Sequence, residues 1–204
     1  MLTVFVEPQR CIACGQCEFA CAVAHSRSLD PVLALVESPQ PRSRVYVQAG
    51  PHPNTAYPNK CRHCDPAPCQ MVCPSGAISR VAASDVVLID ERKCISCAMC
   101  AIVCPFDVIT YHEQAVGDAV VRTVAVKCDG CLDRLAAGRI PACAETCKTG
   151  ALRFGEINDF MAEGQRRETA TVLAAAAAMS PTDADGIVAW RATGAYVATP
   201  GGVR

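Results

Sequence analysis

Short apolar segments separated by loops make up most of the regular pattern in residues 1–155. Thr3 to Val6 and Arg44 to Gln48 alternate apolar and polar positions, which is typical of half-buried strands. Val86 to Ile89 and Val120 to Val126 are rich in β-branched residues and predict two returning strands. The stretch after Cys21 holds six prolines before residue 60 and is predicted to be mainly loop.

The pattern changes in the last part of the chain, which contains no cysteine. Asp159 to Met179 has the composition of a helix, with Asn158 as its predicted N-cap and Ser180-Pro181 as its stop signal. Ile187 to Thr199 predicts a β-hairpin. The most apolar run, Val172 to Met179, has eight residues, whereas a membrane-spanning helix needs about 20. We therefore expect a helix and hairpin extension and no membrane span.

Cysteine is the most informative residue type, at 16 of 204 residues. The cysteines fall into four quartets with none left over: Cys11-Cys14-Cys17-Cys21, Cys61-Cys64-Cys69-Cys73, Cys94-Cys97-Cys100-Cys104 and Cys128-Cys131-Cys143-Cys147. Quartets one and three follow C-x2-C-x2-C-x3-C, the run that holds [4Fe–4S] clusters in bacterial ferredoxins. Quartets two and four are each followed by a similar Gly-Ala-apolar segment. This internal repeat predicts duplicated ferredoxin units.

The spacing also predicts which thiols share a cluster. In two-cluster ferredoxins the fourth cysteine of each run ligates the other cluster. One hairpin joins quartets two and three, so these two are predicted to exchange their fourth cysteines, and quartets one and four are left to do the same. The predicted ligand sets are Cys11, Cys14, Cys17 and Cys147 (cluster 1), Cys128, Cys131, Cys143 and Cys21 (cluster 2), Cys61, Cys64, Cys69 and Cys104 (cluster 3), and Cys94, Cys97, Cys100 and Cys73 (cluster 4).

Other uses of the thiols stay open at this stage. Soft thiolates also bind zinc, but zinc sites usually separate two cysteine pairs by a longer loop. Quartet four has such a loop and is the best zinc candidate, and a [3Fe–4S] cluster in one site is another alternative. Disulfides would need an oxidising compartment. The apolar start from Met1 to Val6 is too short for a signal peptide, so a cytoplasmic protein is expected.

A basic residue precedes the first cysteine of every quartet. These residues are Arg10, Lys60, Lys93 and Lys127. A nearby cation favours the reduced, more negative form of a cluster and raises its potential, so these residues are candidates for tuning; ordinary solvated charges are the alternative. His25 and His63 lie beside quartet cysteines. Because no quartet lacks a cysteine, both histidines are predicted to be loop or hydrogen-bonding residues.

Composition narrows the function. A formal net charge of −1 gives no basic field for nucleic acid. Aromatic residues are only 5% of the chain, so a core poor in large side chains is expected to depend on bound metal. We find no nucleophile–base pair, no dinucleotide-binding glycine motif and no phosphate-binding loop. The chain is therefore predicted to be no enzyme on its own.

Two segments resemble a known family. CRHCDPAPCQMVCPSGAI, from Cys61 to Ile78, and KCDGCLDRL with the later GRIPACAETC, from Lys127 to Cys147, are similar to the second and fourth motifs of four-cluster ferredoxin-type electron-transfer subunits. Such subunits serve dimethyl sulfoxide reductases, formate dehydrogenases, hydrogenases, carbon monoxide dehydrogenase and tungsten aldehyde oxidoreductases. The resemblance covers residues 1 to about 155 and departs at Lys148, where proline is usual. It implies four [4Fe–4S] clusters and supports the crossed pairing of the cysteines.

These observations predict an α+β fold with two ferredoxin-like (bacterial 2[4Fe–4S]) units related by pseudo-symmetry. Residues 58–112, with quartets two and three, would form a unit inserted into an outer unit of residues 1–57 and 113–155. Residues 156–204 would form a C-terminal docking extension. Its Trp190 and Tyr196 are residue types that often anchor interfaces, so this extension is expected to bind a partner or a second copy of the chain.

The expected function is electron relay. The resemblance implies a large catalytic oxidoreductase subunit as the partner, either a molybdenum or tungsten enzyme, such as aldehyde oxidoreductase or formate dehydrogenase, or carbon monoxide dehydrogenase. A flavin- or NAD-linked subunit is one candidate for the downstream acceptor. A cysteine-rich zinc-binding interaction protein and a free-standing polyferredoxin carrier are the alternatives.

Overall fold

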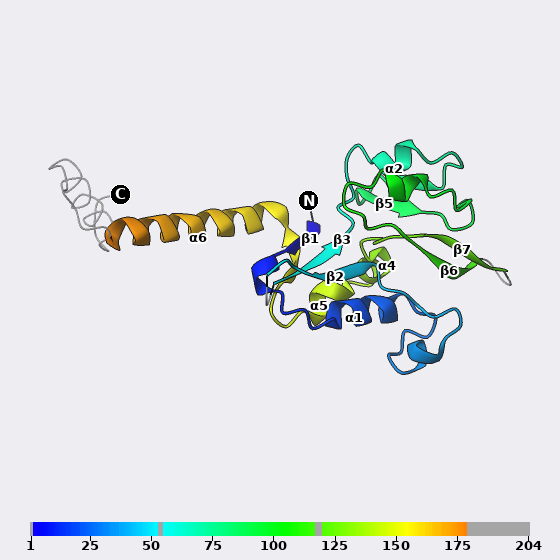
Figure 1. Cartoon of the computed structure of the whole chain (residues 1–204), viewed down its shortest axis with the longest axis horizontal. Helices are drawn as coiled ribbons and strands as arrows, with labels where there is room; N and C mark the ends of the chain where they lie inside the picture. Colours follow the sequence, from blue (N-terminus) through cyan, green and yellow to red (C-terminus); the bar gives the residue numbers. More distant parts are fainter. Residues whose placement is uncertain (1, 53–54, 117–119, 179–204) are drawn as a thin grey trace. The chain divides into compact units, whose positions relative to one another are not determined.

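The computed structural model describes residues 2–52, 55–116 and 120–178 (Figure 1). In these residues all strands are paired in two-stranded antiparallel sheets. The pairs are β1 (Leu2–Val6) with β8 (Leu152–Glu156), β2 (Val45–Ala49) with β3 (Ala56–Lys60), β4 (Ile78–Val81) with β5 (Val86–Ile89), and β6 (Thr110–Val116) with β7 (Val120–Val126). The sheet of β1 and β8 joins the start of the chain to the segment after quartet four.

The helices before residue 157 are short. They are η1 (Pro8–Arg10), α1 (Gln16–Ala24), η2 (Leu33–Val36), α2 (Pro68–Met71), α3 (Met99–Ile102), α4 (Leu132–Ala136) and α5 (Ala142–Thr146). Helix α1 packs against α5, and α2 packs against α3. Figure 1 shows α2 with β5 at one side of this part and α1 with α5 at the other.

The buried residues form two small clusters. The first contains Val87, Val124 and Val126 and extends between β5 and β7. The second has five buried members, Val45, Leu152 and three cysteines. Large aromatic residues are absent from the buried members of both clusters. The cysteines are thus a substantial part of the interior rather than an addition to it.

The structure confirms the strands predicted at Val86–Ile89 and Val120–Val126, and it extends or shifts the other two by one residue. Strands β3, β4, β6 and β8 are additional to these four predicted segments. These pairs give the mixed helix and small antiparallel sheets expected of an α+β ferredoxin-like protein. Quartets two and three are joined by the β4–β5 hairpin, and quartets three and four by the β6–β7 hairpin.

Helix α6 spans Ile157–Ala178 and begins two residues earlier than predicted. The prediction of Asn158 as its N-cap is wrong, because β8 ends at Glu156 and the helix follows directly, so that Asn158 is already helical. Residues up to Asn158 form one compact unit, and Asp159 begins a second. The predicted stop signal, the hairpin at 187–199, Trp190 and Tyr196 lie outside the described residues. Within residues 2–52, 55–116 and 120–178, no helix has both the length and the apolar character needed to cross a membrane.

Candidate iron–sulfur sites

The loop that opens each quartet has the same unusual backbone conformation. The residue before the second cysteine is left-handed in all four quartets: Ala13 (φ 56°), His63 (φ 51°), Ser96 (φ 57°) and Gly130 (φ 70°). Only glycine adopts this conformation without steric cost. Left-handed residues can turn successive backbone N–H groups toward one centre, which favours an anion there. The loops are thus shaped to surround a negatively charged group.

The segments around these loops repeat as well. Gly15 and Ala98 follow the second cysteine in quartets one and three, and both are left-handed N-caps of the next helix. A tight turn follows the fourth cysteine in three quartets. The residue three positions after that cysteine is left-handed in each: Gly76, Asp107 and Gly150. The N–H of each bonds to the carbonyl oxygen of that fourth cysteine at 3.2, 3.3 and 3.3 Å, respectively. The sequence repeat is therefore also a backbone repeat.

Thiols from different quartets meet in three cavities. Each cavity takes three cysteines from one quartet and the fourth from another. The sets are Cys128, Cys131, Cys143 and Cys21 (cavity 2), Cys61, Cys64, Cys69 and Cys104 (cavity 3), and Cys94, Cys97, Cys100 and Cys73 (cavity 4). The remaining thiols, Cys11, Cys14, Cys17 and Cys147, belong to quartets one and four.

Part of this remaining set is also close together. Burial, followed by the charge of Glu18 and the nearby thiols Cys147 and Cys11, raises the pKa of Cys17 to about 11. The structure thus brings together thiols that the spacing assigns to common sets, while their ligation of a cluster stays a prediction. Only Cys14 and Cys97 among the sixteen cysteines are exposed.

The crowding of thiols fits a cationic iron core. Burial raises the pKa of Cys131 to about 12, with added contributions from Asp129 and neighbouring thiols. Burial also raises the pKa of Cys143 well above its usual value, and the thiols of Cys128 and Cys21 act in the same direction. Metal ligands must be thiolates. These sites therefore need a strong positive centre to hold four thiolates together.

Backbone N–H groups donate to several of the sulfur atoms. The pairs are Arg44 to Cys21, His63 to Cys61, Ala125 to Cys94, Gly130 to Cys128 and Leu152 to Cys147, with N···Sγ distances of 3.2–3.4 Å. Hydroxyl groups add contacts, such as that between Tyr111 and the Sγ of Cys100 at 3.3 Å. Hydrogen bonds to cluster sulfurs orient the ligands and raise the reduction potential.

The four basic candidates divide into two pairs. Arg10 makes an ion pair with Glu7 at 2.7 Å, and Lys93, with 63% of its side chain exposed, lies 3.7 Å from Asp90. Lys60 and Lys127 are each only 4% exposed. Among the described residues, no carboxylate lies within ion-pair distance of either buried ammonium group. Two buried cations without a protein counter-charge fit an anionic cluster nearby.

Sequence reasoning missed the ion-pair network that holds the loop of quartet four. Asp129 lies 2.6 Å from Nη1 of Arg44 and 3.0 Å from Nε2 of His25. Burial lowers the pKa of His25, but the hydrogen bonds to Asp129 and Cys21 outweigh it and raise the pKa to about 9. His25 is thus a cation at neutral pH and, as predicted, a hydrogen-bonding residue. The network joins the segment before β2, the end of α1 and quartet four.

We expect Asp129→Asn to lower the free energy of unfolding of the holoprotein by about 2 kcal/mol, because it leaves two partly buried cations without their counter-charge. Anaerobic urea unfolding of protein with unchanged iron content measures the loss. Glu145→Gln is the matched control, since Glu145 is exposed where it pairs with Arg134 and Arg139, and its loss should cost less than about 1 kcal/mol. Equal effects of the two substitutions would contradict this prediction.

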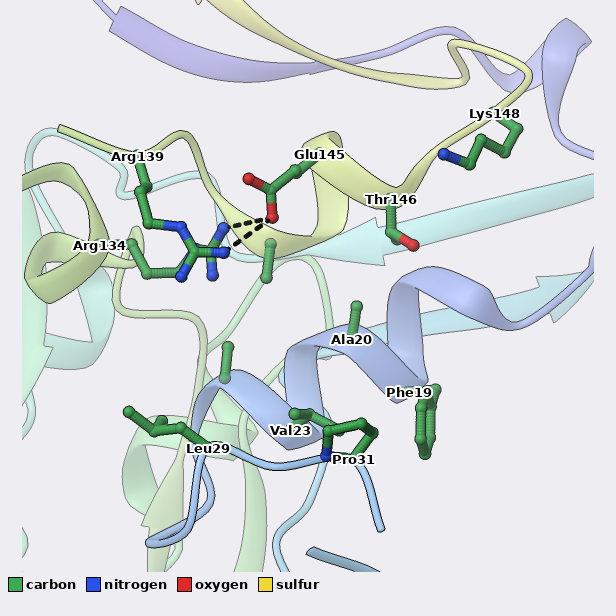
Figure 2. Close-up of a pocket in the computed structure, with 12 residues that line it drawn as sticks. Phe19, Ala20, Val23, Leu29, Pro31, Arg134, Arg139, Glu145, Thr146 and Lys148 are labelled. Atoms are coloured by element: carbon green, nitrogen blue, oxygen red, sulfur yellow. Dashed lines mark hydrogen bonds and ion pairs between the residues drawn. The ribbon is translucent and has the colours of Figure 1, made fainter. Parts of the chain in front are cut away.

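A hollow without cysteine lies beside α1 and α5 (Figure 2). Its volume is about 500 Å³, and Phe19 and Val23 of α1 supply part of its apolar side. Arg134 and Arg139 face Glu145 in this hollow at 2.5 and 3.3 Å. Because no thiol lines it, it is distinct from the three cavities where cysteines converge.

The repeated loops, the convergent thiols and the anion-directed backbone define an iron–sulfur protein. Comparison with known proteins agrees: a model of the family described as "4Fe-4S dicluster domain" matches residues 54–157. The chain belongs to this family, and its cofactor is the [4Fe–4S] cluster.

Several relatives share most of the chain. An "Iron-sulfur protein" of Rhodospirillum rubrum is 38% identical to this chain, and the match covers 82% of this chain and 90% of the relative. The "Thiosulfate reductase electron transfer subunit PhsB" of Salmonella typhi is 37% identical, covering 75% of this chain and 74% of the subunit. A relative from Escherichia coli that is named for anaerobic dimethyl sulfoxide reductase is 34% identical, covering 76% of this chain and 73% of the relative. This chain spans only 21% and 24% of two longer Escherichia coli relatives, both named putative oxidoreductases.

Proposed function

We propose that this chain is a non-catalytic electron-transfer subunit that carries four [4Fe–4S] clusters. The observation that supports this most directly is the convergence of thiols from different quartets in cavities 2, 3 and 4. A bound [4Fe–4S] cluster supplies one-electron transfer without making or breaking a bond to substrate. The chain's own residues would ligate the clusters, shield them from water and set their potentials.

The four ligand sets predicted above are part of this proposal. Clusters 2, 3 and 4 would occupy the cavities of the same number, and cluster 1 would be bound by the remaining thiols of quartets one and four. The inserted unit of residues 58–112 would hold clusters 3 and 4, and residues 1–57 with 113–155 would hold clusters 1 and 2. The pairing of β1 with β8 supports the outer unit, because it closes the chain around quartets one and four.

The exposure of the thiols suggests where electrons enter and leave. Cys14, a predicted ligand of cluster 1, and Cys97, a predicted ligand of cluster 4, are exposed, whereas the thiols of cavities 2 and 3 are buried or partly buried. We propose that clusters 1 and 4 exchange electrons with other subunits and that clusters 2 and 3 connect them. Every electron crossing the chain would then pass from the outer to the inserted unit.

The proposed partner is a large catalytic oxidoreductase subunit. The relatives named for thiosulfate reductase and dimethyl sulfoxide reductase support this class of partner. Within it we propose a molybdenum or tungsten enzyme or carbon monoxide dehydrogenase, with a flavin- or NAD-linked subunit as a candidate acceptor. Residues 156–204 would dock a partner or a second copy. The sixteen thiols favour a reducing compartment, and the cytoplasm is proposed.

Anaerobic purification of the chain from its native cells tests the proposed role. We expect a brown complex in which a large oxidoreductase subunit co-purifies, and in which substrate of that subunit bleaches the iron–sulfur absorbance of this chain. The matched control is the catalytic subunit alone, which should keep its reaction with artificial dyes. A chain that purifies with full iron content but is never reduced by its co-purifying enzyme would contradict the electron-transfer role.

A further inference from the structure

Two buried lysines and one histidine lie where cavities 2 and 3 approach each other. Lys60 lines cavity 2 and Lys127 lines cavity 3. His63 lines both cavities. Lys60 and His63 lie at the start of quartet two, and Lys127 lies directly before quartet four. Lys60 therefore belongs to the proposed inserted unit, and Lys127 belongs to the proposed outer unit.

Each lysine lies in the cavity formed mainly by the quartet that it does not precede in sequence. Lys60 directly precedes Cys61, which lines cavity 3, yet Lys60 itself lines cavity 2. Lys127 directly precedes Cys128, which lines cavity 2, yet Lys127 itself lines cavity 3. The two arrangements are reciprocal, because each lysine is attached to one quartet and faces the thiols of the other.

The influence of each ammonium on the thiols follows the same crossed pattern. The charge of Lys127 acts on Cys69 in cavity 3. The charge of Lys60 acts on Cys128 and Cys143 in cavity 2. Each lysine thus favours negative charge in the cavity of the other unit.

The hydrogen bonds of the lysines leave their charge uncompensated. The Nζ of Lys60 donates to the carbonyl oxygen of Cys61 at 3.3 Å, and the Nζ of Lys127 donates to those of Cys128, at 3.0 Å, and Val87. Carbonyl oxygens satisfy the donors but carry no net charge. A buried ammonium is costly without a counter-charge. An oxidised [4Fe–4S] core with four thiolates carries a net charge of about −2 and supplies one.

His63 adds an unused donor at the same place. The backbone N–H of Val87 donates to Nδ1 of His63 at 3.1 Å, so Nδ1 is the acceptor and the ring proton of the neutral imidazole is on Nε2. Nε2 is buried and has no hydrogen-bond partner among the described residues. The Nε2–H of His63 is therefore available to a cluster sulfur.

We propose that Lys60, His63 and Lys127 form a crossed junction that sets the potentials of the two inner clusters, with Lys60 acting on cluster 2 and Lys127 on cluster 3. This inference rests on the proposed function. Reduction adds one electron from an external reductant to a cluster core, which passes from 2+ to 1+, and no bond is broken. The ammonium of the opposite unit stabilises the added negative charge. The junction thereby raises the reduction potentials of clusters 2 and 3, through which electrons are proposed to pass between the two units.

Lysine substitutions in the full-length holoprotein test the crossing. EPR-monitored redox titration should show that Lys127→Met lowers the midpoint potential of cluster 3 and Lys60→Met that of cluster 2. We expect each to shift the reduction equilibrium about tenfold, or about 59 mV for a one-electron couple. Lys127→Arg and Lys60→Arg should keep the potentials, because they keep the charge. Lys93→Met is the exposed control and should shift its equilibrium less than about twofold, because solvent screens its charge.

Ligand substitutions identify the clusters that shift. Cys69→Ser should alter the signal of cluster 3 and Cys143→Ser that of cluster 2, which would assign each midpoint potential to its cluster. With iron content unchanged, unshifted potentials, or shifts in the cluster on the lysine's own quartet, would overturn the junction. If instead the native chain contains no [4Fe–4S] clusters, the proposed function fails before the junction is tested. If a methionine variant loses iron, the corresponding glutamine variant supplies the measurement.

The histidine has its own readout. His63→Leu removes the Nε2–H donor and should lower the midpoint potential of at least one inner cluster. His63→Gln keeps a donor at the same left-handed backbone position and should restore part of the shift. Because both variants carry the same backbone strain, a difference in potential between them reports on the donor. Equal potentials for native protein and both variants would remove His63 from the junction.

Discussion

Removal of iron is expected to unfold residues 2–158. The five buried members of one core cluster include Cys17, Cys21 and Cys143, so the loss of the metal removes the contacts that bring these side chains together. Every sheet in the described residues has only two strands, and an isolated two-stranded sheet is marginal in water. Without iron, the two buried ammonium groups also lose their counter-charge. The free energy of unfolding should therefore fall from the usual range of about 5–15 kcal/mol to near zero or below.

Hydrogen exchange after anaerobic chelation measures this outcome segment by segment. We expect backbone amides throughout residues 2–158 to lose protection, including those of β5 and β7. Residues 159–178 of helix α6 should serve as an internal comparison, since they belong to a separate compact unit. Reconstitution with iron and sulfide should restore protection. Apoprotein that keeps protected amides in β1 and β8 would show that the side chains fold this part without metal.

Two substitutions four residues apart should remove different clusters. Cys143 lines cavity 2 with Cys128 and Cys131, whereas Cys147 neighbours Cys17. Cys143→Ser should therefore change the EPR signal of cluster 2, and Cys147→Ser that of cluster 1. Each variant should lose up to about a quarter of its iron, because one of four clusters is weakened. Serine is close in size to cysteine, so the change tests ligation more than packing.

The comparison of Cys143→Ser with Cys147→Ser separates the two models of ligation, because both cysteines belong to quartet four. If quartet four bound a single cluster by itself, both substitutions would alter the same signal. Cys21→Ser extends the test, since Cys21 also lines cavity 2 although it belongs to quartet one. Its spectrum should match that of Cys143→Ser. A match between the spectra of Cys21→Ser and Cys17→Ser would contradict the crossed ligand sets.

Much of the fold could be predicted because its strongest signals are local. The spacing of quartets one and three indicates the cofactor, and the β-branched runs at 86–89 and 120–126 indicate β5 and β7. Strand β3 was missed because it contains Pro58, and proline usually argues against a strand; here Pro58 is opposite Val47 at the edge of a two-stranded sheet. Strand β6 was given no predicted range because its middle, around Glu113, is polar.

The details of the site depend on contacts that no local pattern contains. Lys60, Lys93 and Lys127 are alike in sequence, each standing directly before a quartet, yet Lys93 is exposed and the other two are buried. That difference arises because cavities 2 and 3 lie next to each other, whereas Lys93 lies on the outside. The pairing of Asp129 with Arg44 joins residues 85 positions apart. The sequence places His63 only beside two cysteines. Its position in the lining of both cavities could not be predicted, because it depends on how the quartets fold together.

The most direct test is the metal and sulfide content of the chain purified anaerobically in its native state. Four [4Fe–4S] clusters predict about sixteen iron and about sixteen acid-labile sulfide atoms per chain, with no zinc. About eight iron and about eight sulfide atoms per chain would correspond to only two clusters and would contradict the four-cluster proposal. About twelve iron atoms with one zinc would mean that zinc replaces one cluster, which would contradict the four-cluster proposal.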